Sequence, residues 1–329
     1  ALHLREGTGA PNDFQDIRGQ EAAKRAMEIA AAGLHNVLLL GPPGSGKTML
    51  AERLATILPE WNLEEAIETT KIYSVAGLVR PRNGLMAARP FRSPHHTISD
   101  AGLVGGGNNP MPGEISLAHH GVLFLDELPE FRKNALETLR QPLEAGFVTI
   151  ARAAATATYP ARFLLVAAMN PCPCGYFGDR ARTCRCSSQQ VRQYQGRVSG
   201  PLMDRIDLHI DVPSLPYRDL TGSASGESSA AIRERVVRAQ HIQEQRFGGG
   251  TARFNAHMGE RELTRHCAID GDSRRLLELA VERLGFSARA FSRILKLGRT
   301  IADLEGEPRI LSRHVAEAIQ YRNLNRHLI

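Results

Sequence analysis

The chain has 329 residues, of which 42% are hydrophobic and 23% charged, and its formal net charge is +6. This length fits one large domain or two smaller ones, the hydrophobic content is enough to bury a sizeable core, and the charged content is close to that of an ordinary soluble protein. No apolar run approaches the roughly 18 residues of a membrane span and residues 1–5 show no signal-peptide pattern, so we expect a cytoplasmic protein with no membrane partner. The chain does not begin with Met, so we expect further residues upstream. The positive charge allows an anionic partner beyond a nucleotide, or no more than a basic surface.

The first part of the chain predicts a phosphate-binding loop. A helical stretch over residues 21–32 leads into the apolar run 37–40, a glycine-rich loop and a second helical stretch over 49–58. The loop matches G-x-x-x-x-G-K-[ST], in which backbone N–H groups at a helix N-terminus surround a phosphate. We expect Lys47 to reach the β- and γ-phosphates of ATP and the Thr48 hydroxyl to bind Mg²⁺. The residues of this segment expected at the nucleotide are Gly41, Pro42, Gly44, Ser45, Gly46, Lys47, Thr48 and Met49.

Further short apolar runs predict a parallel sheet with polar groups at its carboxyl edge. Residues 122–125 end in Asp126 and Glu127, and residues 163–169 end in Asn170. Near-continuous apolar runs are typical of parallel strands covered on both faces, and ligands bind at the carboxyl ends of such strands. Residues 208–212 alternate in polarity, which favours a strand nearer an edge. The fold class is therefore α/β, with helices on the faces of a parallel sheet.

The polar residues after these strands suit ATP hydrolysis. Asp126 is expected to hold Mg²⁺, and Glu127 to orient and deprotonate the attacking water. Asn170 suits a hydrogen bond to the same water or to the γ-phosphate, although an asparagine after a strand also occurs as a turn former.

The C-terminal part predicts a separate helical domain. Residues 214–230 are rich in Ser, Gly and Pro and read as a linker. Helical patterns follow over 231–245, 276–284 and 291–301, and Ser312 is expected to cap a last helix. The predicted organisation is an α/β core over 1–213, the linker, and a small all-helical domain over 231–329.

Two arginines suit a role at the phosphates. Arg205 carries the planar, permanently charged group that stabilises a developing phosphoryl charge, and the alternative is an ion pair with Asp204 or Asp207. Arg289 follows Ser287, which is expected to cap a helix. A cation in the first turn opposes the helix dipole, which favours a functional reason for Arg289.

Four of the five cysteines form two C-x-C pairs, and these predict a metal site. The cysteines are Cys172, Cys174, Cys184 and Cys186. Four thiolates within 15 residues suit a structural Zn²⁺, and a structural disulfide is disfavoured in reducing cytosol. Free thiols and redox chemistry remain the alternatives.

Together these motifs resemble the AAA+ ATPases. The phosphate loop, Asp126-Glu127, Asn170, the segment 204–207 and Ser287-Ala-Arg289 match the motifs of that family. The segments 197–208 and 299–304 resemble its magnesium-chelatase-like group, and 92–96 and 170–175 resemble a bacterial group of branch-migration helicases within it.

The resemblance implies an AAA+ core with a helical lid and a hexameric ring. It implies that Arg205 is an arginine finger acting on the neighbouring subunit's ATP, that Arg289 is sensor 2, and that Ile17 and Gln20 lie beside the adenine. These helicases usually carry an N-terminal Lon-like domain, so we expect this chain to be part of a longer protein.

Two segments fit insertions of this group, whose relatives touch DNA with such loops. They are residues 72–115 and a hairpin over 148–159 before the strand that ends in Asn170. The candidate DNA contacts are Arg80, Arg82, Arg89, Arg92 and Arg152. The hairpin tip is rich in alanine and carries one cation, so a structural hairpin with solvated arginines is the alternative.

The resemblance implies an ATP-driven branch-migration helicase acting on DNA in recombination during natural transformation. One alternative is a chelatase motor subunit that drives metal insertion into a tetrapyrrole. Another is a nucleotide-dependent module that assembles with a protein partner.

Overall fold

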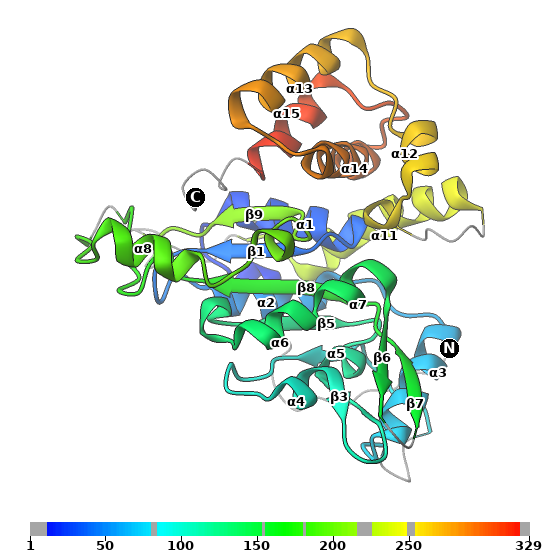
Figure 1. The fold of residues 1–329 in the computed structure, drawn as a ribbon. Coiled ribbons are helices and arrows are strands. Elements are labelled where there is room, and N and C mark those ends of the chain that lie inside the picture. Colours follow the sequence, from blue (N-terminus) through cyan, green and yellow to red (C-terminus); the bar gives the residue numbers. More distant parts are fainter. Residues whose placement is uncertain are drawn as a thin grey trace. The chain divides into compact units, whose positions relative to one another are not determined.

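The computed structural model describes residues 12–79, 84–152, 155–179, 182–215, 226–248 and 254–322 (Figure 1). The strands β1 (Val37–Leu40), β2 (Phe91–Arg92), β5 (Val122–Leu125), β8 (Leu164–Met169) and β9 (Leu208–Asp211) form a parallel sheet in the order β2-β5-β8-β1-β9. The predicted α/β class is confirmed, and β9 is the edge strand that its alternating sequence indicated. None of the helices in these residues combines the length and hydropathy that a membrane span needs.

The chain divides into two compact units whose borders differ from the predicted ones at 213 and 231. One consists mainly of Glu60–Ala168 and Arg197–Arg205, and the other of Asp13–Pro59, Met169–Gly196 and Ile206–Ile329. The second unit therefore joins the phosphate-loop segment to the C-terminal helices. The physical reason is that these helices pack against the N-terminal helix of the core.

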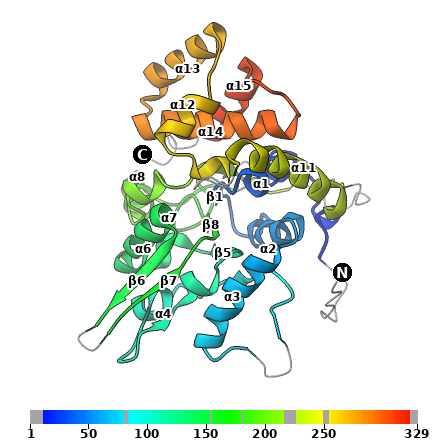
Figure 2. The same cartoon turned by 90° about the vertical axis from the view of Figure 1, so that its right-hand side faces the viewer.

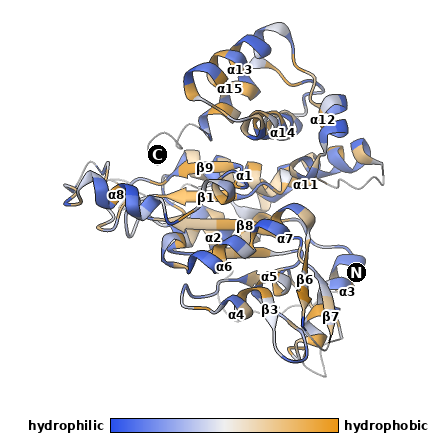
Figure 3. Ribbon diagram, viewed as in Figure 1, coloured by the Kyte–Doolittle hydropathy of each residue, from blue (hydrophilic) through white to orange (hydrophobic). Residues whose placement is uncertain are grey.

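In the first unit, β5 and β8 are buried along their whole length and pair in parallel, with Val122 opposite Leu164. β2 pairs with the other side of β5. Besides α4 (Asp100–Val104), the helices of this unit include α3 (Leu63–Val75), α5 (Glu114–Leu117), α6 (Lys133–Thr138), α7 (Arg140–Ala145) and α9 (Gly200–Met203). Figure 3 shows β5 and β8 in the colours of hydrophobic residues, as expected for strands buried on both faces.

The two predicted insertions pack against each other in this first unit (Figure 1). The hairpin is confirmed as β6 (Phe147–Ala151) and β7 (Thr156–Pro160), an antiparallel pair. The segment before β5 contains α4 (Asp100–Val104) and the short antiparallel pair β3 (Gly105–Gly106) and β4 (Met111–Pro112). The Tyr159 hydroxyl donates to the Pro110 carbonyl at 2.7 Å, and a Cβ on Gly105 would lie 2.6 Å from Ile150 Cδ1. The hairpin is thus held against the β3–β4 pair by direct contact.

In the second unit, β1 and β9 pair in parallel between helices formed by distant parts of the chain. α1 (Glu21–Gly33) contacts α2 (Lys47–Ile57), α11 (Ser229–Phe247) and α14 (Ala288–Leu304). Figure 2 shows α11 running beside α1 and α2. The remaining helices are α8 (Ser188–Gln195), α12 (Glu260–His266), α13 (Gly271–Leu284) and α15 (Ser312–Gln320).

Two predicted features of the C-terminal part need correction. α11 begins at Ser229, inside the predicted linker, of which residues 216–225 lie outside the described residues. Ser229 is buried, and its Oγ accepts from the Phe14 N–H at 2.8 Å and lies 2.7 Å from Thr56 Oγ1. Ser312 is the first residue of α15 rather than its cap. The cap position is occupied by Leu311, whose N–H donates to the His314 Nδ1 at 3.0 Å.

Candidate nucleotide site and cysteine cluster

The phosphate loop has the backbone shape that its glycines allow. Gly44 has φ 77° and Gly46 has φ 94°, both in the left-handed region that glycine tolerates best. Gly41 follows β1, and a Cβ there would lie 2.1 Å from the Val212 carbonyl oxygen. The loop ends at α2, whose first residue is Lys47, as the motif predicts.

Lys47 and Asn170 meet in the structure. Lys47 is only 8% exposed, and its ammonium donates to the carbonyls of Gly41 (2.8 Å) and Pro42 (2.9 Å) and to Asn170 Oδ1 (3.2 Å). A buried ammonium is costly unless hydrogen bonds satisfy it, so these three oxygens hold it at the mouth of the loop. The predicted sensor residue therefore lies next to the predicted phosphate-binding lysine.

The other loop residues present donors and open surface to a ligand. Ser45 Oγ is buried and has no hydrogen-bond partner among the described residues, which suits a phosphate oxygen as its missing partner. Thr48 and Met49 are exposed on the first turn of α2. The N-terminus of α2, the Ser45 hydroxyl and the Lys47 ammonium together form a site that suits an anion.

The chain segment before α1 adjoins this loop. Gln20 adopts φ 57°, and its Nε2 donates to the Pro213 carbonyl at 2.8 Å and lies 3.4 Å from the Ser45 carbonyl. Ile17, three residues before Gln20, is buried and follows a short capped turn at Phe14–Asp16. Gln20 therefore lies next to the phosphate loop, as expected for a residue near the nucleotide. Its contact with adenine, like that of Ile17, stays a prediction.

The acidic pair follows β5 in the first unit. Glu127 adopts φ 53°, an uncommon value for a residue with a side chain, and its N–H donates to Asp126 Oδ1 at 2.9 Å. The Glu127 carboxylate is 53% exposed, and its Oε2 lies 3.1 Å from His96 Nδ1. The His96 ring stacks on His95 at 4.1 Å between centroids. Sequence reasoning did not find the contact between His96 and Glu127, because 31 positions separate the two residues and nothing in either segment indicates the pairing.

Arg205 is buried and paired within its own chain. Its guanidinium forms an ion pair with Glu144 of α7, and Nη1 donates to the Pro201 carbonyl at 2.6 Å. The alternative drawn from the sequence was an ion pair with Asp204 or Asp207, but Asp207 pairs with Arg293 of α14. A role of Arg205 at another subunit's nucleotide requires its release from Glu144.

Arg289 lies where the sequence placed it. Ser287 Oγ accepts from the Ala290 N–H at 3.2 Å, which confirms the predicted cap, and Arg289 is exposed in the first turn of α14. The same helix is anchored by Arg293 and by Thr300, whose Oγ1 lies 2.7 Å from His35 Nε2. Arg289 is therefore an exposed cation on a firmly held helix.

Most of the arginines expected to contact DNA either bind acidic side chains of this chain or lie outside the described residues. Arg80 and Arg82 are outside the described residues. Arg89 donates to Glu65 Oε2 at 3.0 Å and to the His120 carbonyl at 2.8 Å. Arg92 makes two hydrogen bonds of 2.6 Å to Glu114. Of the three described arginines, Arg152 is the exposed one, and it lies directly after β6 in the β6–β7 hairpin.

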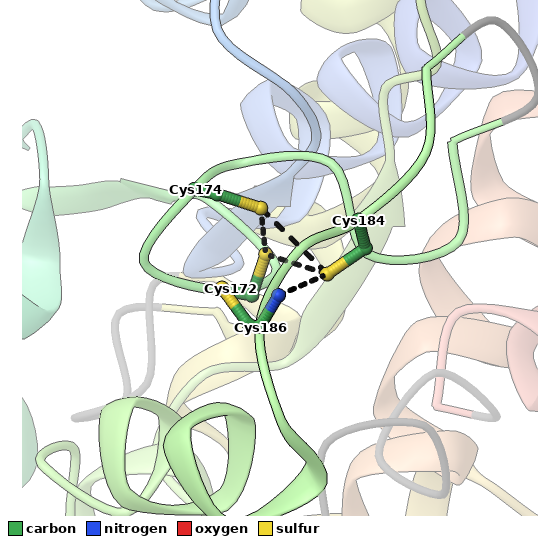
Figure 4. A group of neighbouring side chains, drawn as sticks. All are labelled: Cys172, Cys174, Cys184 and Cys186. Carbon is green, nitrogen blue, oxygen red and sulfur yellow. Dashed lines mark hydrogen bonds between the residues drawn. The ribbon is translucent and has the colours of Figure 1, made fainter.

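The four clustered cysteines converge on one point (Figure 4). The Sγ–Sγ distances are 3.4 Å for Cys172 to Cys174, 3.7 Å for Cys172 to Cys184 and 3.6 Å for Cys174 to Cys184. The sulfur of Cys186 lies within 4.8 Å of the other three. The N–H groups of Arg185 and Tyr176 donate to Cys174 and lower the pKa of this thiol to about 6. The pKa values of Cys184 and Cys186 are raised instead, because a backbone hydrogen bond that lowers each is outweighed by desolvation and contacts with the neighbouring sulfurs. Burial raises the pKa of Cys267 to about 12, so this thiol stays protonated.

The chain matches the family models "Magnesium chelatase, subunit ChlI" over residues 13–220 and "Magnesium chelatase, subunit ChlI C-terminal" over residues 226–322. This chain belongs to the magnesium chelatase ChlI family. The match covers the phosphate loop, the acidic pair, the cysteine cluster and the helix of Arg289, and the fold is that of the AAA+ ATPases.

Among the relatives of this ChlI-family chain, "Competence protein ComM" of Haemophilus influenzae is 52% identical over 318 residues. The "Uncharacterized protein YifB" of Salmonella typhimurium is 48% identical over 323 residues. These matches cover 95% and 97% of this chain but only 60% and 62% of the relatives. The "Magnesium-chelatase 67 kDa subunit" of Chlorobaculum parvum is 28% identical over 162 residues, which is 48% of this chain and 23% of that protein.

The motif 299–304, which carried part of the resemblance to this family, has a structural reason. Arg299 is buried, pairs with Asp303 at 3.0 Å and donates to the Pro308 carbonyl at 3.0 Å. Arg246 of α11 pairs with the same carboxylate, and Asn255 donates to it at 2.8 Å. This buried network joins α11 to α14, which carries Arg289.

Proposed function

We propose that this chain is the ATP-hydrolysing motor of a DNA branch-migration helicase that acts in recombination during natural transformation. The observation that carries ATP hydrolysis is the phosphate loop with Lys47 bonded to Asn170 in a ChlI-family fold. The step to DNA is supported by the 52% identity to a protein named for competence, which is the uptake of DNA.

The residues have distinct roles in the proposed reaction. The phosphate loop binds the β- and γ-phosphates, and Lys47 exchanges its carbonyl partners for phosphate oxygens while keeping Asn170. Thr48 and Asp126 would hold Mg²⁺, which would neutralise phosphate charge, and Glu127 would take the proton of the attacking water. Arg289 neutralises phosphate charge from the lid. The proposed cofactors are ATP and Mg²⁺, with one Zn²⁺ at the four cysteines.

We place the active assembly in a homo-hexameric ring, in which Arg205 serves the neighbouring subunit. Arg205 then leaves Glu144 for the γ-phosphate as the ring closes around ATP. A variant Arg205→Ala is expected to bind ATP normally and to hydrolyse none. Mixed with Lys47→Ala subunits, it should recover part of the activity at those interfaces where an intact Lys47 faces an intact Arg205. Verified mixed rings without activity would show that Arg205 acts within its own subunit.

The β6–β7 hairpin is the proposed DNA contact. Arg152 is exposed directly after β6, next to the β3–β4 pair, where a Cβ on Gly106 would be 3.3 Å from Arg152 Nη2. An exposed arginine in this position suits contact with the phosphate backbone, which makes binding salt-dependent and nearly independent of base sequence.

The deciding experiment is strand displacement on forked and four-way DNA with ATP. Parent protein should unwind, Lys47→Ala should not, and Arg152→Ala should lose unwinding but retain basal ATPase. The matched control is Arg238→Ala, because Arg238 is an exposed arginine on α11 with an exposed partner, Glu234. Parent protein that hydrolyses ATP but neither binds nor unwinds DNA would refute the helicase.

The second candidate is a chelatase motor, favoured by the family description and by the similarity to a magnesium-chelatase subunit. That relative matches only 48% of this chain, which is why we prefer the helicase. ATPase activity stimulated by a tetrapyrrole-binding partner, and not by DNA, would reverse this order.

A further inference from the structure

The loop that holds the four cysteines adjoins two parts of the nucleotide site, Asn170 and the phosphate loop. It starts directly after Asn170, whose Oδ1 accepts from Lys47, and it returns to α8 after Cys186. Gln195 of α8 donates to the Pro171 carbonyl at 2.8 Å, so the helix is tied back to the first residue of the loop. Asn170 is therefore one peptide unit away from the point where this loop is tied to α8.

The spacing of the sulfurs tests whether a metal fits. In a tetrahedral site with Zn–S bonds of about 2.3 Å, two sulfurs are separated by about 3.8 Å. The three sulfur–sulfur distances in the structure, 3.4 to 3.7 Å, are close to this separation. They are far longer than the S–S bond of about 2.05 Å in a disulfide. The Cys186 N–H also donates to Cys184 Sγ at 3.4 Å, which is the kind of contact that orients a ligating thiolate. Three of the six sulfur–sulfur spacings thus fit a tetrahedral site, and Cys186, whose sulfur lies within 4.8 Å of the others, supplies the fourth thiol that a closed structural zinc site needs.

The same loop touches the phosphate loop directly. Gly175 has φ 86°, and a Cβ at this position would lie 2.5 Å from Pro43 Cδ and 2.8 Å from Pro43 Cγ. The N–H of Gly175 donates to the Cys172 carbonyl at 2.9 Å, so the position of Gly175 depends on that of a metal ligand. Pro43 lies between Pro42, which accepts from Lys47, and Gly44 of the phosphate loop.

We propose that the zinc site is a brace of the nucleotide site, which sets Asn170 from one side and Pro43 from the other. With zinc bound, the turn from Cys172 to Gly175 has one shape, and the phosphate loop rests against it. Without zinc, four thiols separate, the turn loosens, and the phosphate loop and Asn170 lose a common support. This proposal depends on the proposed ATP binding, and separate measurements of metal content and of nucleotide affinity distinguish a failure of one from a failure of the other.

The metal is measured first, on the whole chain as purified. Elemental analysis should give about one Zn²⁺ per chain, and Cys184→Ser or Cys186→Ser should lose it. Replacement by Co²⁺ should give the strong thiolate charge-transfer absorption of a tetrahedral four-sulfur site. Folded parent protein that takes up neither metal would overturn the site.

The coupling is measured by binding of a fluorescent ATP analogue with Mg²⁺. Removal of zinc by a chelator should weaken binding about tenfold or more, because displacement of binding groups by about 1 Å has effects of this order. Zinc removal that leaves the affinity unchanged in folded protein would overturn the brace. Zinc-loaded parent protein that binds no ATP analogue would instead refute the proposed function, while the metal content would still test the site.

Two glycines of this loop provide a matched pair that leaves the cysteines intact. Gly175 and Gly178 have φ 86° and 77°, so alanine meets the same backbone strain at both. Only at Gly175 does a Cβ meet Pro43, since a Cβ on Gly178 has nothing within 4 Å. Gly175→Ala should keep its zinc and bind the ATP analogue about tenfold more weakly, whereas Gly178→Ala should match the parent within about twofold. Equal affinities for the two variants would overturn the contact as a route of coupling.

Discussion

The ion pair between Asp207 and Arg293 provides a quantitative test of how α14, the helix of Arg289, is held. Asp207 precedes β9 and is buried, and it also accepts from the Asn36 N–H at 3.0 Å. Arg293 lies one turn after Arg289 on α14. Burial opposes ionisation of Asp207, but the charge of Arg293 and the nearby His35 outweigh it and hold the pKa of Asp207 far below its usual range. The perturbation is Arg293→Ala, which leaves this carboxylate buried without its cation.

The expected loss of stability follows from the burial of the pair. Breaking a buried ion pair by removing one partner costs about 3–5 kcal/mol. The Arg293 side chain is 21% exposed, against 4% for Asp207, so we expect the lower end, about 3 kcal/mol. For a cooperative unit of about 150–250 residues this lowers Tm by roughly 6–12 °C. The matched control, Arg238→Ala, removes an exposed pair worth about 0.3–0.5 kcal/mol and should change Tm by no more than about 2 °C.

The effect should also depend on pH with a defined sign. The folded-state pKa of Asp207 is depressed, so the stabilisation is fully present above the unfolded value of about 3.9 and is lost as pH falls toward the folded value. The difference in stability between parent and Arg293→Ala should therefore be constant from pH 6 to 8 and shrink below about pH 4.

The assay is thermal and urea unfolding of the parent, Arg293→Ala, Asp207→Asn and the double variant. A double-mutant cycle isolates the coupling between the two side chains from other effects of each substitution. A coupling below about 0.5 kcal/mol, or a loss in Arg293→Ala no larger than that in Arg238→Ala, would refute the reasoning that this pair anchors α14.

Three further predictions concern the reaction itself. Glu127→Gln should bind ATP and hydrolyse it about 10²-fold more slowly, since a general base contributes 10²–10⁴-fold, and hydrolysis at the parent rate in a phosphate-release assay would remove Glu127 from that role. His96→Ala should raise the basal ATPase rate severalfold, because the imidazole 3.1 Å from Glu127 competes with water for the carboxylate, and a slower variant would show instead that His96 orients Glu127. Gly41→Ala should abolish binding of an ATP analogue, because its Cβ would lie 2.1 Å from the Val212 carbonyl oxygen; Gly271→Ala, where a Cβ has open space, is the control expected to bind like the parent.

The sequence by itself determined those features that depend on residues close together in the chain. The phosphate loop, the buried strands β1, β5 and β8, the β6–β7 hairpin and the Ser287 cap all lie where local pattern placed them. The physical reason is that loop shape, strand periodicity and capping are set within a few residues. The meeting of Lys47 with Asn170 was also predictable, because parallel strands bring their carboxyl ends to one edge of a sheet.

The tertiary structure alone decided which charged groups have partners. Arg89 and Arg92 looked like free cations of a basic insertion, yet Glu65 and Glu114 hold them. Arg205 is held by Glu144, 61 positions away, and Glu127 lies against His96. Ion pairs of this kind leave no periodic signal, because any of many carboxylates in the chain is chemically suitable. The number and spacing of the clustered cysteines were evident in the sequence, but only the fold showed that their four sulfurs lie within 4.8 Å of one another and that Gly175 packs against Pro43.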